Sequence, residues 1–291
     1  MTDPGFVAAL PAWGWVLVAA LFGLLVGSFL NVVILRLPAR MAYLWRQEAR
    51  DILELEVVDE PRPPGLVREP SHCPSCKHRL AAHDNIPLFG WLWLRGRCRY
   101  CRTRISAQYP LVELACAVLS ALVVAKFGVS YAGGAGLLFV WSLIALTGID
   151  FRTQLLPDSI TLPLLWLGLL LALKGLYIPL QSAVIGAAVG YLSLWSVYWL
   201  FKLLTGKEGM GHGDFKLLAA LGAWMGPVAI LPIVLVSSLL GALIGGGMML
   251  ARRHQPGVPM AFGPFIALAG LLWFLAGPTL LHAYLGLMGL R

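Results

Sequence analysis

The stretch Leu217–Leu250, LLAALGAWMGPVAILPIVLVSSLLGALIGGGMML, runs for 34 residues without a charged side chain. An α-helix needs about 20 apolar residues to cross the hydrocarbon core of a bilayer. The stretch is therefore too long for one span, and Gly226-Pro227 offers a natural break inside it. The sequence predicts two short membrane helices here, over residues 214–226 and 228–251.

Composition extends this prediction to the whole chain. Hydrophobic residues make up 59% of the 291 positions, charged residues make up 12%, and the mean hydropathy is +0.79. Soluble domains carry about 25% charged residues. We therefore expect an all-α integral membrane protein with about eight transmembrane helices. They are expected at roughly 13–35, 108–126, 131–149, 157–173, 178–201, 214–226, 228–251 and 260–287.

The basic residues predict the orientation of these helices, because cytoplasmic loops are enriched in Lys and Arg. The segment between residues 36 and 110 holds 13 of the 22 basic residues. With this segment in the cytoplasm, eight spans place 19 basic residues inside and both termini outside. The remaining inside residues are Arg152, Lys202, Lys207, Lys216, Arg252 and Arg253. Those left outside are Lys126, Lys174 and Arg291. The net charge of +8 thus indicates membrane topology and no nucleic-acid partner.

Four cysteines lie in this polar segment, as Cys73-x-x-Cys76 and Cys98-x-x-Cys101, with 21 residues between the pairs. Two such pairs supply four thiolates to one tetrahedral Zn²⁺. Two disulfides are an alternative that a reducing cytoplasm disfavours, and a redox pair is another. We predict a zinc site. Cys116 lies inside an expected span and is interpreted as a small core residue.

Two aspartates fall at the expected cytoplasmic face. Asp150 ends a wholly apolar helix, and Asp214 lies in Gly209-Met-Gly-His-Gly-Asp-Phe-Lys216. A charge within a membrane helix is costly, which makes it a functional candidate. Either aspartate alone can be a solvated helix terminus or an N-cap. Together they suit peptide hydrolysis, in which one carboxylate activates water and the protonated partner donates to the carbonyl oxygen. The sequence leaves the assignment of base and acid open.

Two functions of other classes remain compatible with the pattern. A transporter or channel also uses aspartates within its membrane helices as a proton or ion path. A zinc-bearing adaptor anchored in the membrane would use the cysteines alone. A protease loses peptide cleavage when either aspartate is replaced, whereas a transporter or an adaptor has no such activity to lose.

Several motifs in order make the chain resemble the type IV prepilin peptidases, which are intramembrane aspartyl proteases of the GxGD type. The matching stretches are Gly27–Pro38, Glu69–Cys76, Asp84–Pro87, Leu94–Cys98, Cys101, Ile105-Ser106, Tyr109–Glu113, Asp150, Leu156–Asp158 and Gly209–Leu217.

The resemblance implies an enzyme of the bacterial inner membrane that cuts the basic leader from prepilins and pseudopilins. It implies N-methylation of the new amino terminus with S-adenosylmethionine. The family's catalytic aspartates fall on Asp150 and Asp214, and its glycine for methyl transfer falls on Gly96. Its four-cysteine domain falls on Cys73, Cys76, Cys98 and Cys101. Substrates from a type IV pilus or from a type II secretion system are both expected.

The expected domains are a first transmembrane helix (1–36), a cytoplasmic zinc-binding domain (37–110), a peptidase membrane core (111–251) and a C-terminal loop with the last helix (252–291). The large cysteine-bearing insert argues against a relative of the same protease class that lacks methyl transfer. No Gly-x-Gly-x-x-Gly motif follows a strand, so the S-adenosylmethionine site rests on the resemblance alone. Glu113, Asp158 and Glu208 are candidate anchors for a basic leader, with ordinary capping or packing as the alternative.

Overall fold

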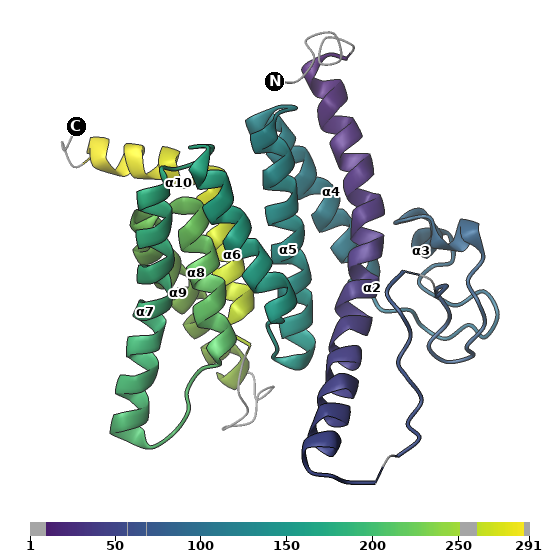
Figure 1. The fold of residues 1–291 in the computed structure, drawn as a ribbon. Coiled ribbons are helices and arrows are strands. Elements are labelled where there is room, and N and C mark those ends of the chain that lie inside the picture. The colour runs from purple at the N-terminus through teal and green to yellow at the C-terminus, as the bar shows by residue number, and fades with distance from the viewer. Residues whose placement is uncertain (1–9, 57, 68, 251–260, 288–291) are drawn as a thin grey trace. The chain divides into compact units, whose positions relative to one another are not determined.

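A computed structural model describes residues 10–56, 58–67, 69–250 and 261–287 (Figure 1). Helices make up most of these residues outside the segment between α2 and α4, and none of the described residues forms a strand. The α-helices are α2 (Ala12–Ile52), α3 (Phe89–Trp93), α4 (Gln108–Phe127), α5 (Tyr131–Thr153), α6 (Asp158–Leu173), α7 (Leu180–Thr205), α8 (His212–Met225), α9 (Ile230–Leu250) and α10 (Gly263–Leu287). Two 3₁₀ turns, η1 (Ala82–Asn85) and η2 (Pro227–Ala229), complete the elements. The all-α prediction is confirmed.

Five of the described helical segments are long and apolar enough to cross a bilayer. They are Ala12–Ile52, Gln108–Phe127, Tyr131–Thr153, Leu180–Thr205 and Pro227–Met248. Two shorter apolar helices, Asp158–Ala172 and Gly263–Gly277, also match expected spans. The chain is therefore a multi-pass membrane protein, and eight crossings remain a prediction. Arg252, Arg253 and Arg291, which enter the predicted charge split, lie outside the described residues.

The first helix is longer than the sequence predicted. It was expected to end near residue 35, yet α2 continues to Ile52 and contains Pro38. The guanidinium of Arg36 bonds to the carbonyl oxygens of Gly65 (2.6 Å) and Glu69 (3.0 Å), which holds the following segment against the helix. A proline within a helix removes one backbone hydrogen bond. The helix nevertheless continues past Pro38 to Ile52, and the segment that follows the helix packs back against Arg36.

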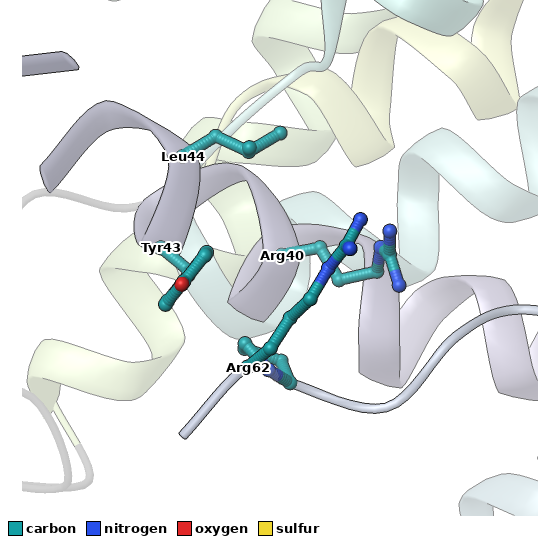
Figure 2. A pocket seen from close by; sticks show the side chains of 5 residues that line it. Arg40, Tyr43, Leu44 and Arg62 are labelled. Atoms are coloured by element: carbon teal, nitrogen blue, oxygen red, sulfur yellow. The ribbon is translucent and has the colours of Figure 1, made fainter. Parts of the chain in front are cut away.

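The chain divides into two compact units, Met1–Ala145 and Leu146–Arg291. In the first, α2 and α4 lie side by side (Figure 1). The indole N–H of Trp141 donates to the hydroxyl of Ser120 on α4 over 2.9 Å. A small pocket lies beside the C-terminal half of α2 (Figure 2). It is lined by the side chains of Arg40, Tyr43, Leu44, Arg62 and Pro63.

Helix α8 is the core of the second unit. Every residue from Asp214 to Trp224 except Lys216 is buried, and the helix contacts α6, α7, α9 and α10. Its closest approach is to α7, where Gly186 and Gly222 face each other. A Cβ atom added to either glycine would overlap the carbonyl oxygen of the other. The backbones of α7 and α8 thus meet directly, which small residues permit in membrane bundles.

We expect Gly222→Ala to lower the stability of the protein, because the added methyl group forces α7 and α8 apart. Overpacking of this kind costs about 1–3 kcal/mol. Thermal unfolding in detergent should show a lower Tm. The matched control is Gly134→Ala in α5, where no atom lies within 4 Å of an added Cβ. Equal Tm values for the two variants would contradict the direct backbone contact.

Candidate active site and cysteine cluster

The second unit brings Asp150 and Asp214 together. Asp150 lies in the last turn of α5, and Asp214 lies in the first turn of α8. Both are buried, with 4% and 7% of their surface exposed. Asp150 lies close enough to Asp214 for its charge to act on that side chain. Two carboxylates separated by 64 positions in the sequence thus form one pair.

Each aspartate keeps one oxygen free of protein hydrogen bonds. Among the described residues, neither Oδ2 of Asp150 nor Oδ1 of Asp214 has a hydrogen-bond partner. Buried polar atoms are nearly always bonded, and an exception calls for a functional explanation. These two oxygens are available to a water molecule or a substrate group.

Glycines let the backbone approach this pair closely. A Cβ added to Gly263, the first residue of α10, would come within 2.6 Å of Oδ2 of Asp150. A Cβ on Gly213 would come within 2.8 Å of the Cβ of Leu156, and Leu156 also contacts Gly263. Gly263 was not among the site residues predicted from the sequence. Its signal was the Gly-Pro dipeptide at the start of the last apolar run.

Aromatic rings fix the start of α8 against α7. The ring of His212 lies 5.1 Å from that of Tyr198 and 5.4 Å from that of Phe215, centroid to centroid. The rings of Tyr198 and Phe215 are 5.7 Å apart. Such contacts stabilise both helices beyond the area that they bury. They hold the Gly-rich turn that carries Asp214.

The four predicted cysteines meet in one cluster in the first unit. All four sulfur atoms lie within 4.8 Å of one another. The Sγ atoms of Cys73 and Cys101 are 3.7 Å apart, and those of Cys76 and Cys98 are 4.0 Å apart. A zinc ion bound at about 2.3 Å by four sulfurs would space them about 3.8 Å apart. The donor set and its spacing therefore fit tetrahedral zinc.

The two cysteine pairs share one backbone pattern. The N–H of Cys73 donates to the carbonyl of His78, and the N–H of Cys98 donates to that of Thr103, both over 2.9 Å. The residue after each pair, Lys77 or Arg102, has a positive φ of 58° or 59°. Hydrogen bonds with Thr103 lower the pKa of the Cys101 thiol to about 6, which favours the thiolate that metals bind.

Gly96 links α3 to the second cysteine pair. Its N–H donates to the carbonyl of Trp91 over 2.9 Å, and its own carbonyl accepts from Ile105 over 2.8 Å. Its φ is +66°, a value that favours glycine. An added Cβ would also come within 2.8 Å of the Trp91 ring. Gly96 is therefore fixed by packing within this segment.

The three candidate anchors for a basic leader occupy different environments. Asp158 pairs with Lys216 over 2.7 Å, and Glu208 pairs with Lys202 over 2.8 Å. Glu113 is buried in α4, and its Oε2 accepts the N–H of Leu88 over 2.8 Å. The first two carboxylates are thus already neutralised within the chain.

Comparison with known proteins covers nearly the whole chain. The model of the bacterial peptidase A24 N-terminal domain matches residues 21–127, and that of the type IV leader peptidase family matches residues 137–246. A protein from Xanthomonas campestris pv. campestris is 55% identical over 273 residues, which is 94% of this chain and 95% of that protein. One from Stutzerimonas stutzeri is 51% identical over 286 residues, 98% of both chains. One from Pseudomonas aeruginosa is 50% identical over 278 residues, 95% of this chain and 96% of that one.

All three relatives are named prepilin leader peptidase/N-methyltransferase. No solved structure matches the chain. The resemblance drawn from the motifs is confirmed, and the chain is an enzyme with peptidase and methyltransferase activity. Both family models and the relatives lead to one conclusion: the chain belongs to the type IV leader peptidase family.

Proposed function

We propose that this protein removes the leader peptide from type IV prepilins and pseudopilins and then methylates the new amino terminus with S-adenosylmethionine. The names of the relatives support both activities. The observation that carries the peptidase proposal is the buried pair Asp150 and Asp214. Each of these side chains has an oxygen without a partner among the described residues.

The proposed chemistry uses the two carboxylates as one unit. Like charges held close cannot both ionise, so the pair shares one proton. The ionised carboxylate takes a proton from water, and the protonated one donates to the oxygen of the scissile carbonyl. The hydroxyl adds to the carbonyl carbon. In the collapse of the tetrahedral intermediate, the carboxyl that took the proton from water donates it to the leaving nitrogen, which becomes the new amino terminus. The other carboxylate takes a proton from a hydroxyl of the intermediate, so that the pair again holds its single proton in the starting arrangement. Either aspartate suits either role.

The proposed site faces the cytoplasm of a bacterial inner membrane. The basic residues Arg152 and Lys216 follow the two aspartates by two positions each, and Lys202 and Lys207 lie in the segment before Asp214. Cytoplasmic loops carry such an excess of Lys and Arg. In a substrate with a basic leader and an apolar helix, the leader lies in the cytoplasm and the helix lies in the membrane. The scissile bond between them therefore lies at the cytoplasmic face, where the site is proposed.

We propose that Cys73, Cys76, Cys98 and Cys101 hold one structural Zn²⁺. Support comes from the sulfur spacing and from the repeated backbone pattern around the two pairs. The ion would cross-link a segment with few regular elements, as structural zinc does in small domains.

We further propose that methyl transfer takes place on the first unit and depends on Gly96. S-adenosylmethionine supplies the methyl group when bound. Gly96 keeps α3 and the second cysteine pair in register through its contacts with Trp91 and Ile105. A larger residue at position 96 would change the shape of this region.

We expect Asp150→Asn and Asp214→Asn each to reduce leader cleavage by about 10²–10⁴-fold or more, because an amide replaces one member of the acid–base pair. Cleavage of a prepilin peptide by protein purified in detergent is the measurement. Asp51→Asn, which removes an exposed carboxylate of α2, is the control and should cleave normally. Full cleavage by either active-site variant would exclude the aspartate mechanism, and the Tm of each variant checks its folding.

Elemental analysis should find about one zinc per chain in the intact protein. Cys98→Ser should lose most of this metal, because serine is a poor zinc ligand. Cys116→Ser provides the matched control, since Cys116 is buried in α4 away from the cluster. Equal zinc contents in the two variants would argue against a four-cysteine site.

A further inference from the structure

Glu113 differs from the other carboxylates considered as leader anchors. Asp158 and Glu208 each have a lysine partner. Glu113 is 6% exposed, and no Lys, Arg or His of the described residues forms an ion pair with it. A buried charge is costly unless a partner of opposite charge is present. The position therefore suits a cation supplied by a ligand.

The contact between α2 and α4 brings a second acceptor beside Glu113. Gly27 of α2 lies against this residue, and a Cβ added there would come within 2.7 Å of the Cα of Glu113. One turn further along α2, Asn31 donates to the carbonyl of Tyr109 over 3.1 Å. Tyr109 lies one turn before Glu113 on α4. Asn31 and Glu113 thus occupy neighbouring turns of one interface.

The amide of Asn31 is held with its oxygen unused. Its Nδ2 donates to the carbonyls of Tyr109 and Gly27, and these two bonds orient the side chain. Asn31 is 1% exposed, and its Oδ1 has no hydrogen-bond partner among the described residues. A buried acceptor without a donor is unfavourable. A ligand with N–H groups would satisfy it.

Glu113 also retains acceptor capacity. Its carboxylate bonds to the N–H of Leu88 and to the hydroxyl of Ser28. A carboxylate offers about four lone-pair sites, so acceptor sites remain. An alkylammonium group carries one positive charge and three N–H donors. Its charge is opposite to that of Glu113, and its three donors are enough for both Glu113 and Asn31.

We infer that Glu113 and Asn31 form a binding site for a primary ammonium group of the substrate. This inference rests on the proposed function. Two ammonium groups of the substrate have this chemistry: a lysine side chain of the basic leader, and the amino terminus that cleavage creates. Glu113 also holds Leu88, which directly precedes α3 and the segment of Gly96. The site therefore connects to the part of the first unit proposed for methyl transfer.

Peptide binding distinguishes the two sources. The Asp214→Asn protein in detergent keeps a precursor peptide intact while its affinity is measured. One pair of peptides consists of a precursor with a leader lysine and its Nε-acetylated form, both acetylated at the amino terminus. The other pair is a mature peptide with a free or an acetylated amino terminus. Acetylation should weaken binding by about tenfold or more in at least one pair, as expected for a hydrogen-bonded charge.

Three variants in the same background test the residue. Glu113→Gln keeps the shape of the side chain and loses its charge. Acetylation of the peptide should therefore no longer lower its affinity for this variant. Glu113→Asp keeps the charge and should retain more of the effect. Glu48→Gln is the control and should retain all of it, since Glu48 is an exposed carboxylate of α2. An effect of acetylation that survives in Glu113→Gln would overturn the site.

A chemical cross-link tests the contact without any variant at Glu113. Dicyclohexylcarbodiimide activates a carboxyl group, and an amine in contact displaces the urea to form an amide. Mass spectrometry of the digested protein should place the bound peptide on Glu113. Attachment only to other carboxyls would overturn the inference.

If wild-type protein cleaves the precursor and acetylation has no effect in either pair, the ammonium site alone fails. If wild-type protein does not cleave, the proposed function fails.

Discussion

A carboxylate inside an apolar helical bundle carries a large desolvation penalty unless a proton, a cation or hydrogen-bond donors compensate it. Asp150, Asp214 and Glu113 are the buried acidic residues among the described positions. In the pair, each aspartate faces another carboxylate. Glu113 accepts from the neutral N–H of Leu88, and none of the described Lys, Arg or His residues forms an ion pair with it. The surrounding helices must keep these groups in place, since each would be more stable in water.

Direct backbone contact is how the helices do this. Gly186 and Gly222 let α7 and α8 meet, so that α8 is enclosed along its length and Asp214 has a fixed position at its start. Gly263 lets the start of α10 approach Asp150. Where the backbone comes this close, side chains cannot fill the space beside the carboxylates. Small residues thus provide the tight packing on which the positions of both aspartates depend.

The two units correspond closely to the two family models. Residues 21–127 lie in the first unit, and all but the first nine of residues 137–246 lie in the second. The aspartate pair belongs to the second unit, and the cysteine cluster, Gly96 and Glu113 belong to the first. In the proposed function, cleavage and methyl transfer are different reactions at the same substrate end. Under the proposed function, this division gives each reaction its own surroundings: buried acids for hydrolysis, and a cysteine-rich segment for methyl transfer.

The sequence alone determined the helical class, the break at Gly226-Pro227, and the cysteine set, because hydrophobic runs and ligand spacing are local properties. It also identified Asp150 and Asp214 as a candidate pair, since loop charge places both at one membrane face. Tertiary structure decided the features that depend on neighbours distant in the chain. The continuation of α2 to Ile52, the approach of Gly263 to Asp150, and the lysine partners of Asp158 and Glu208 are of this kind. The physical reason is that burial and ion pairing depend on which segments pack together, and hydropathy does not specify those partners.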